Sequence, residues 1–297
     1  MATQNNKKEG FGESVINWFP GHMAKTRREI KENINLVDII YEVIDSRMPI
    51  SSKIVDIDEL IGNKDKVLIM TKYDLCDKEE TNKFINYYKS LGYKVLPLDL
   101  MGMKDVSKQV LNISSDTYLN MNELRKNKGM KPRALRAMVV GVPNAGKSTL
   151  INRLVNKKAA NVGNKPGVTK NISWIRINKD LELLDTPGIL WPKLENQKYA
   201  HNLAVLSSIK EDIIDPEQLA NYIITILYEL YPERVKKRYN VTNVDLNNMF
   251  EFYDNVGKNR GALLKDNKID YDKVFSIIIN DLKNNKFGNI TFDRIEG

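Results

Sequence analysis

The chain has 297 residues, of which 42% are hydrophobic and 28% charged, a composition typical of a globular protein with one large or two medium domains. Its formal net charge of +8 favours a polyanionic partner such as RNA, although many soluble proteins are mildly basic without one. A single cysteine, Cys76, excludes an internal disulfide and indicates a reducing, cytoplasmic compartment. No apolar run approaches the roughly 18 residues that a membrane span needs.

In the first half of the chain, strands and helices are expected to alternate. Residues 1–13 are polar and are expected to form a flexible tail without a secretory or transit signal. The spacing of apolar residues predicts helices over 24–34, 54–61, 78–91 and 106–126, and strands over 37–44, 66–70 and 93–98. Gly129 to Pro132 then reads as a linker.

The second half begins with another alternating stretch and then becomes helical. Strands are predicted over 137–140, 172–177 and 181–184, with a helix over 149–155. After about residue 193 only helices are expected, over 218–230, 246–256 and 271–284. The alternation predicts an α/β fold with a parallel sheet covered on both faces, over residues 14–200. Residues 201–297 are expected to form a second, all-helical domain.

One segment, Gly141-Val-Pro-Asn-Ala-Gly-Lys-Ser148, matches the pattern G-x-x-x-x-G-K-[ST]. It lies between a predicted strand and a predicted helix, as a phosphate-binding loop does. Glycines let the backbone wrap a phosphate and point N–H groups inward, and the helix N-terminus adds a favourable dipole. Lys147 can then reach the outer phosphates, and Ser148 can offer its hydroxyl to Mg²⁺.

A second phosphate-facing segment is predicted at Asp185-Thr-Pro-Gly188, which follows a strand. The Asp185 carboxylate can hold Mg²⁺ through water, and the Gly188 N–H can meet a γ-phosphate. The pattern D-x-x-G is common by itself and gains its meaning from its place downstream of the glycine loop. Thr169, which lies between the two motifs, is either a further Mg²⁺ ligand or an ordinary turn threonine.

The base is indicated by Thr71-Lys-Tyr-Asp74, at the end of a predicted strand. A carboxylate there can accept hydrogen bonds from guanine N1–H and from the exocyclic amine. Adenine offers neither donor in that arrangement, so it leaves the carboxylate unpaired, which is costly. The stem of Lys72 can cover the face of the base. These four residues in isolation are also compatible with an ordinary turn, and the phosphate loops favour the base pocket.

The motifs resemble those of GTPases, but the base motif precedes the glycine loop. This order is similar to that of the circularly permuted, YlqF-like GTPases. The resemblance extends over nearly the whole chain and rests on Trp18–Lys25, Asp45–Arg47, Asp185–Pro192, Gly257–Gly261 and Lys286–Gly288. It implies a permuted P-loop GTPase domain followed by an all-helical domain. It also implies a GTP-hydrolysing factor that binds ribosomal RNA on the precursor of the large ribosomal subunit, with no membrane or DNA partner.

Two departures from the family pattern concern the base. Thr71 replaces the usual asparagine of the base motif, which removes an amide. The segment Asp99-Leu-Met101 lacks the small residue that the family places beside the guanine carbonyl.

Catalysis is not explained by the residue that follows D-x-x-G. Ras-like enzymes place a glutamine there to orient water, whereas this chain has Ile189 and then Leu190. Hydrolysis must therefore use another group or be slow until a partner assists. The resemblance implies that His22 positions the water, although a lone histidine also serves in packing. It further implies that Asn144 holds K⁺, although asparagine also suits unusual loop angles.

The nucleotide contacts are expected at Thr71, Lys72, Asp74, Asn144, Ala145, Gly146, Lys147, Ser148, Thr149, Thr169 and Gly188, with Mg²⁺ on Ser148, Thr169 and Asp185. Basic clusters at Arg234 to Arg238 and at Lys258 and Arg260 suit RNA phosphates or form a solvated face. The alternatives are a non-enzymatic RNA-binding scaffold with a structural nucleotide, and an ATP-binding P-loop protein.

Overall fold

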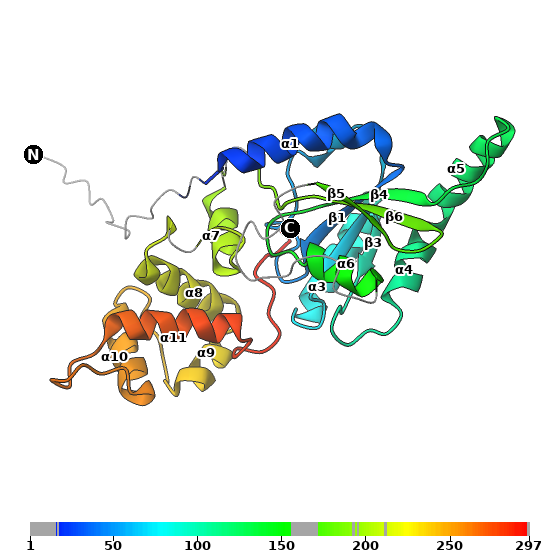
Figure 1. The fold of residues 1–297 in the computed structure, drawn as a ribbon. Helices are drawn as coiled ribbons and strands as arrows, with labels where there is room; N and C mark the ends of the chain where they lie inside the picture. The colour runs from blue at the N-terminus through cyan, green and yellow to red at the C-terminus, as the bar shows by residue number, and fades with distance from the viewer. Residues whose placement is uncertain are drawn as a thin grey trace, which may run out of the picture.

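The computed structural model describes residues 16, 18–155, 172–191, 194, 196–210 and 213–295. Within these residues, the strands form one sheet in the order β3-β2-β1-β4-β6-β5 (Figure 1). The strands are β1 (Ile39–Asp45), β2 (Asp65–Thr71), β3 (Lys94–Pro97), β4 (Leu135–Val140), β5 (Ser173–Arg176) and β6 (Leu181–Asp185). Every strand expected from the sequence is therefore present, close to its predicted position.

The sheet is parallel except at one edge, which corrects the expectation of a wholly parallel sheet. Strand β1 pairs in parallel with β2 and β4, β2 with β3, and β4 with β6. Strand β5 runs antiparallel to β6, because a short polar turn joins the two. The Asn178 side chain closes this turn by accepting hydrogen bonds from the N–H groups of Asp180 (2.8 Å) and Leu181 (3.0 Å).

Helices cover both faces of the sheet, and alternate residues of β1 point to opposite faces. The covering helices are α1 (Gly21–Asn33), α2 (Ile57–Ile61), α3 (Lys78–Ser90), α4 (Val106–Ile113) and α6 (Lys147–Val155). Ile39 and Tyr41 join the largest apolar cluster, which includes residues of α4 and α6. Ile40 packs with residues of α1 and α2, and Ile44 packs with residues of α3. This two-sided burial explains why the strands read as continuous apolar runs.

The single helix expected over 106–126 is divided in two, α4 and α5 (Ser115–Asn127), which corrects the prediction. The division lies at Ser114, whose backbone (φ −100°, ψ 3°) leaves the helical region. The Ser114 hydroxyl donates to Val110 O (2.9 Å) and pairs with the buried Tyr41 hydroxyl (2.9 Å). A serine that bonds back to the preceding turn bends a helix, so the polar pair accounts for the break.

Beyond β6 the described chain is helical, apart from an isolated bridge between Leu263 and Ile269. Its helices are α7 (Gln197–Val205), α8 (Pro216–Leu230), α9 (Pro232–Tyr239), α10 (Met249–Arg260) and α11 (Tyr271–Lys283). The sequence did not predict α7 or α9. In α7 every residue from Ala200 to Val205 is buried, so the helix lacks the polar face that reveals an amphipathic period.

The helical region and the sheet share one apolar core. The largest cluster joins Val139 of β4 to Ile223 of α8, Val256 of α10 and Phe292 near the C-terminus. The expected domain boundary between residues 200 and 201 falls inside α7 and stays a prediction. After α11 the chain runs back to the sheet, so that the last described residues lie beside it (Figure 1). Among the described helices, none is long and apolar enough to cross a membrane.

Candidate nucleotide site

The predicted nucleotide motifs follow neighbouring strands and meet at one edge of the sheet. The base motif begins at the end of β2, the glycine loop follows β4, and D-x-x-G begins at the end of β6. These strands are parallel, and β1 lies between β2 and β4. The connections run outward in opposite directions from β1 and β4, which makes this edge a topological switch point, where open α/β sheets bind ligands. Permuted motif order therefore still gives one site.

Close backbone packing explains two glycines of this site. A Cβ on Gly141 would collide with the backbone carbonyl of Val43 in β1. A Cβ on Gly188 would lie 2.7 Å from the Cα of Pro143 in the glycine loop. Only glycine permits these approaches, so the D-x-x-G segment and the glycine loop pack directly against each other.

Lys147 is the first residue of α6 and is buried. Its ammonium donates to the carbonyls of Gly141 (3.0 Å) and Val142 (2.9 Å), within the loop that precedes the helix. Burial lowers the pKa of Lys147 to about 8, while Asp185 opposes this change. Ser148 and Thr149 follow in the first turn of α6, at the positive end of its dipole. The predicted phosphate-binding groups are therefore gathered at one helix N-terminus.

Asp185 ends β6 as a buried carboxyl group. Burial raises its pKa to about 6, although the positive charge of Lys147 acts in the opposite direction. Its Oδ1 has no hydrogen-bond partner among the described residues. A buried acceptor without a partner is costly, so the carboxylate fits a site that is completed by a ligand.

Thr71 is fully buried where β2 leaves the sheet. Its hydroxyl is within bonding distance of Ile44 O in β1 (3.1 Å) and also contacts Ala145 O in the glycine loop. The threonine that replaces the usual asparagine therefore still ties the base motif to the phosphate loop. Its effect on guanine selectivity stays a prediction.

Lys72 lies in the left-handed region (φ 55°) and reaches across the site. Its ammonium donates to Asp45 Oδ2 (2.9 Å) and to Asn144 O in the glycine loop (2.7 Å). Asp45 also accepts two hydrogen bonds from the Arg47 guanidinium, at 3.0 and 2.8 Å. Burial alone would raise the pKa of Asp45, but the charges of Arg47 and Lys72 outweigh it and hold that pKa far below its usual range.

The sequence pointed to Asp45 and Arg47 only as marks of resemblance and gave them no place in the site. Asp45 ends β1, which neighbours β2, so its position at a strand end was the available signal. The buried carboxylate thus fixes the lysine of the base motif.

Asp74, the predicted guanine acceptor, is half-buried in the loop after β2. Burial raises the pKa of its carboxyl group, and the neighbouring Asp99 adds to the effect. The Asp99 carboxylate itself accepts from the N–H groups of Met101 (2.8 Å) and Gly102 (2.7 Å), which shapes the loop after β3. Both carboxylates therefore lie at the ends of adjacent strands, as their positions in sequence require.

Asn144 is in the left-handed region (φ 59°), as the loop-geometry alternative expects. Its side-chain N–H donates to Ser207 O (2.6 Å), and the Ser208 hydroxyl donates to Pro143 O (2.7 Å). The segment after α7 thus contacts the phosphate loop, which nothing in the sequence pattern indicated. The bond to Ser207 uses the amide nitrogen of Asn144, whereas K⁺ would require the amide oxygen, so the K⁺ site stays a prediction.

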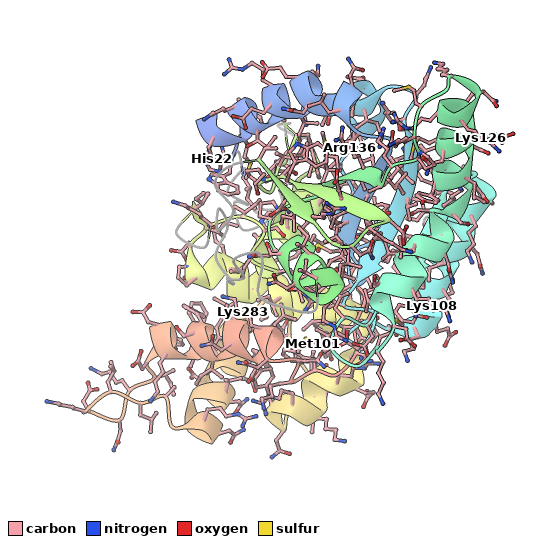
Figure 2. All side chains as sticks on the ribbon, turned by 45° about the vertical axis from the view of Figure 1, so that its right-hand side comes forward. His22, Met101, Lys108, Lys126, Arg136 and Lys283 are labelled. Atoms are coloured by element: carbon pink, nitrogen blue, oxygen red, sulfur yellow. The ribbon has the colours of Figure 1, made fainter. Side chains whose placement is uncertain are left out.

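His22 lies in the first turn of α1, with an exposed side chain (Figure 2). Its backbone carbonyl accepts a hydrogen bond from the Thr26 hydroxyl (2.9 Å). Its role in positioning water stays a prediction, and Thr169 lies outside the described residues. Ile189 is fully buried beside residues of β4, and its N–H donates to Gly141 O (3.2 Å). The position of the usual glutamine is therefore occupied by a side chain buried in the apolar core.

The basic cluster on α9 is partly structural. Arg238 pairs with the buried carboxylate of Asp281 on α11, through its Nε at 2.8 Å. Arg234 contacts Asn289 O and stacks over the Tyr231 ring. Lys237 and Lys258, by contrast, are exposed, and the exposed Arg260 at the end of α10 donates to Arg238 O (2.7 Å). Whether these cations face RNA stays a prediction.

Comparisons with known proteins agree with this arrangement. A family model described as a 50S ribosome-binding GTPase matches residues 136–243. Ribosome biogenesis GTPase A of Priestia megaterium is 42% identical over 94% of this chain and 96% of its own. The Bacillus pumilus protein of the same name is 42% identical over 95% and 99%.

A solved structure gives the same result for the fold. The crystal structure of GNP-bound YlqF from Thermotoga maritima matches with a TM-score of 0.63 and 25% identity, over 91% of this chain and 98% of that one. The permuted motif order, the sheet that reunites the motifs and these relatives lead to one conclusion: the chain is a GTP-binding and GTP-hydrolysing enzyme, and it belongs to the circularly permuted ribosome biogenesis GTPase A family.

Proposed function

We propose that this GTPase acts on the precursor of the large ribosomal subunit in the cytoplasm, where it binds ribosomal RNA in a nucleotide-dependent way. The matched family description and the names of the relatives both support a ribosomal partner. The observation that carries the proposal is the buried Ile189 directly after Gly188. An isoleucine cannot orient the attacking water, so the catalytic site lacks that group at this position. This fits a GTPase whose turnover the ribosomal subunit stimulates.

For the nucleotide itself, we assign Lys147 to the outer phosphates, the Gly188 N–H to the γ-phosphate and Asp74 to guanine. Ser148 and Asp185, together with Thr169, would hold Mg²⁺, which supplies charge neutralisation to the phosphates when bound. The Asp185 Oδ1, which has no hydrogen-bond partner in the described part of the chain, supports this assignment, because a hydrated cation would satisfy it. The remaining contacts are expected from Thr71, Lys72, Asn144, Ala145, Gly146 and Thr149.

Two further assignments concern turnover. Asn144 would hold K⁺ beside the phosphates, where a monovalent cation stabilises developing negative charge. His22 would position the attacking water, and its exposed place on the first turn of α1 leaves the side chain able to turn toward a ligand. Both assignments follow from the family pattern.

The decisive assay is phosphate release from GTP with and without purified large ribosomal subunits. We expect large subunits to raise the rate and small subunits, as the matched control, to leave it unchanged. Turnover in KCl should exceed that in NaCl at equal ionic strength, and Asn144→Ala should remove the difference. His22→Ala should lower stimulated turnover without changing GTP affinity. Equal rates with and without large subunits would contradict the proposal and favour a binding scaffold, and strong competition by ATP would contradict guanine specificity.

We assign RNA binding to the exposed cations Lys237, Lys258 and Arg260. The short connection after Gly188 would make subunit binding depend on the bound nucleotide. Large-subunit affinity should be higher with a non-hydrolysable GTP analogue than with GDP, because a ligand shifts a conformation only through different affinity for two states. The double variant Lys237→Ala, Lys258→Ala should weaken subunit binding. It should also flatten the salt dependence by about one unit of slope per lysine, with GTP affinity unchanged.

A further inference from the structure

The last part of the chain, residues 289–294, crosses the loop that carries the guanine acceptor. We call these residues the C-terminal strap. Figure 1 shows the chain leaving α11 and returning to the sheet. The Asn289 side-chain N–H donates to Asp74 O (2.9 Å), and the Ile290 N–H donates to Leu75 O (3.2 Å). Two successive carbonyls of the base-motif loop are therefore bonded to the opposite end of the chain.

The strap then reaches the start of α3, where the base-motif loop ends. The Thr291 hydroxyl accepts from the Asp77 N–H (3.2 Å) and pairs with the Thr81 hydroxyl (2.9 Å) in a fully buried position. Asp77 is the N-cap of α3, where one carboxylate oxygen accepts from backbone N–H groups of the helix. The other carboxylate oxygen accepts a hydrogen bond from the Tyr231 hydroxyl (3.2 Å). The strap and α8's C-terminal neighbour Tyr231 thus fix the far end of the loop.

The strap is itself anchored by a buried carboxylate. Asp293 accepts from the N–H groups of Ile50 (2.7 Å) and Ser51 (2.8 Å), from the Ser51 hydroxyl (2.5 Å) and from the Asn202 amide (3.1 Å). The neighbouring Phe292 N–H donates to Arg47 O (2.7 Å), in the segment that follows β1. The position of the strap is therefore fixed by the segment that follows β1 and by α7.

From these contacts we infer that Asn289 and Thr291 are positioning residues for guanine recognition. A carboxylate that accepts two hydrogen bonds from one base edge must be held within about half an ångström. Thr71 fixes the loop where it leaves the sheet, and the strap fixes it from Asp74 to Asp77. Among the described residues, no hydrogen bond joins the strap to the phosphate loop or to D-x-x-G, so its influence should be confined to the base. The inference rests on the assignment of Asp74 to guanine.

The test compares the affinities of GDP and of inosine diphosphate, which lacks only the exocyclic amine. Affinities are measured by displacement of a fluorescent GDP from the full-length protein. Asn289→Ala should weaken GDP about threefold, the value of one modest hydrogen bond, and reduce the preference for GDP over inosine diphosphate. Thr291→Val should act in the same direction, whereas Thr291→Ser, which keeps the hydroxyl, should retain the preference.

Asn284→Ala provides the matched control, because this exposed asparagine also bonds a carbonyl, that of Asn280, but within its own helix end. It should leave both affinities unchanged. Asp74→Asn separates the inference from the assignment on which it rests. If that variant keeps the preference for GDP, the assignment of Asp74 fails, and the inference fails with it.

If Asp74→Asn loses the preference while Asn289→Ala and Thr291→Val weaken both nucleotides equally or neither, only the strap inference is overturned. A second measurement does not depend on variants. GDP should slow hydrogen exchange at the N–H groups of Ile290 and Phe292 more than inosine diphosphate does at equal occupancy. Equal protection by the two nucleotides would contradict the inference.

Discussion

Lys147 and Asp185 are both buried at the carboxyl edge of the sheet, and each charge affects the pKa of the other. Their residue types and places were predictable from sequence, because each follows a strand in a known pattern. The hydrogen bond from Lys72 to Asp45 was not predictable, because it depends on the left-handed backbone of Lys72 and on the pairing of β1 with β2. Side-chain pairs of this kind follow from tertiary structure rather than from any local pattern.

These two groups predict a pH optimum for nucleotide affinity. Mg·GTP favours the ionised carboxyl group of Asp185, whose pKa is about 6 in the free protein, so affinity should fall as pH drops below 6. The phosphates favour the charged form of Lys147, whose pKa is about 8, so affinity should fall as pH rises above 8. Titration calorimetry across this range should show a maximum between the two values.

Matched variants assign the two limbs of that profile. Asp185→Asn cannot titrate and should remove the acidic limb, while Lys147→Arg stays charged and should remove the alkaline limb. An acidic limb that persists in Asp185→Asn would show that another group, or the nucleotide itself, causes it.

Helix α9 combines, in adjacent residues, an exposed cation and a partly buried arginine that pairs with a buried carboxylate. Lys237 is exposed, whereas Arg238 pairs with Asp281, which is 7% exposed. The sequence gave a basic cluster but not this division, because a helix of eight residues shows too few turns to reveal its buried face. Helix α7 was missed for a different reason, the burial of every residue from Ala200 to Val205, whereas α3, with its Asp77 cap and regular period, was predicted almost to the residue.

This division predicts that neighbouring substitutions have very different effects on stability. Arg238→Ala should lower the free energy of unfolding by about 3 kcal/mol, because it leaves the Asp281 carboxylate buried without its partner. Lys237→Ala carries the same change of charge and should alter stability by less than about 0.5 kcal/mol. Urea unfolding of both variants measures the difference, and similar midpoints would mean that Arg238 is solvated rather than structural.

For the whole molecule, the main result is that the permuted GTPase domain and the helices form one packed body. They share a continuous apolar cluster, and two further connections join them: Ser207 and Ser208 contact the phosphate loop, while the C-terminal strap crosses the base-motif loop. The sequence predicted the fold class and the separate helical region. It could not predict these two connections, because contacts between residues 63 to 215 positions apart leave no local periodicity.

Shared packing predicts that the two regions unfold together. All three tryptophans, Trp18, Trp174 and Trp191, precede α7, so their fluorescence reports the GTPase domain. Far-UV circular dichroism also reports the helices from α7 to α11. The two urea transitions should coincide, because opening either region exposes the apolar cluster that both line. GDP at about a hundredfold excess over its dissociation constant should stabilise both by about 2.7 kcal/mol. Helical signal that outlasts the fluorescence transition, or a GDP shift seen by fluorescence alone, would mean that the helical region folds independently and that the strap transmits nothing between the two.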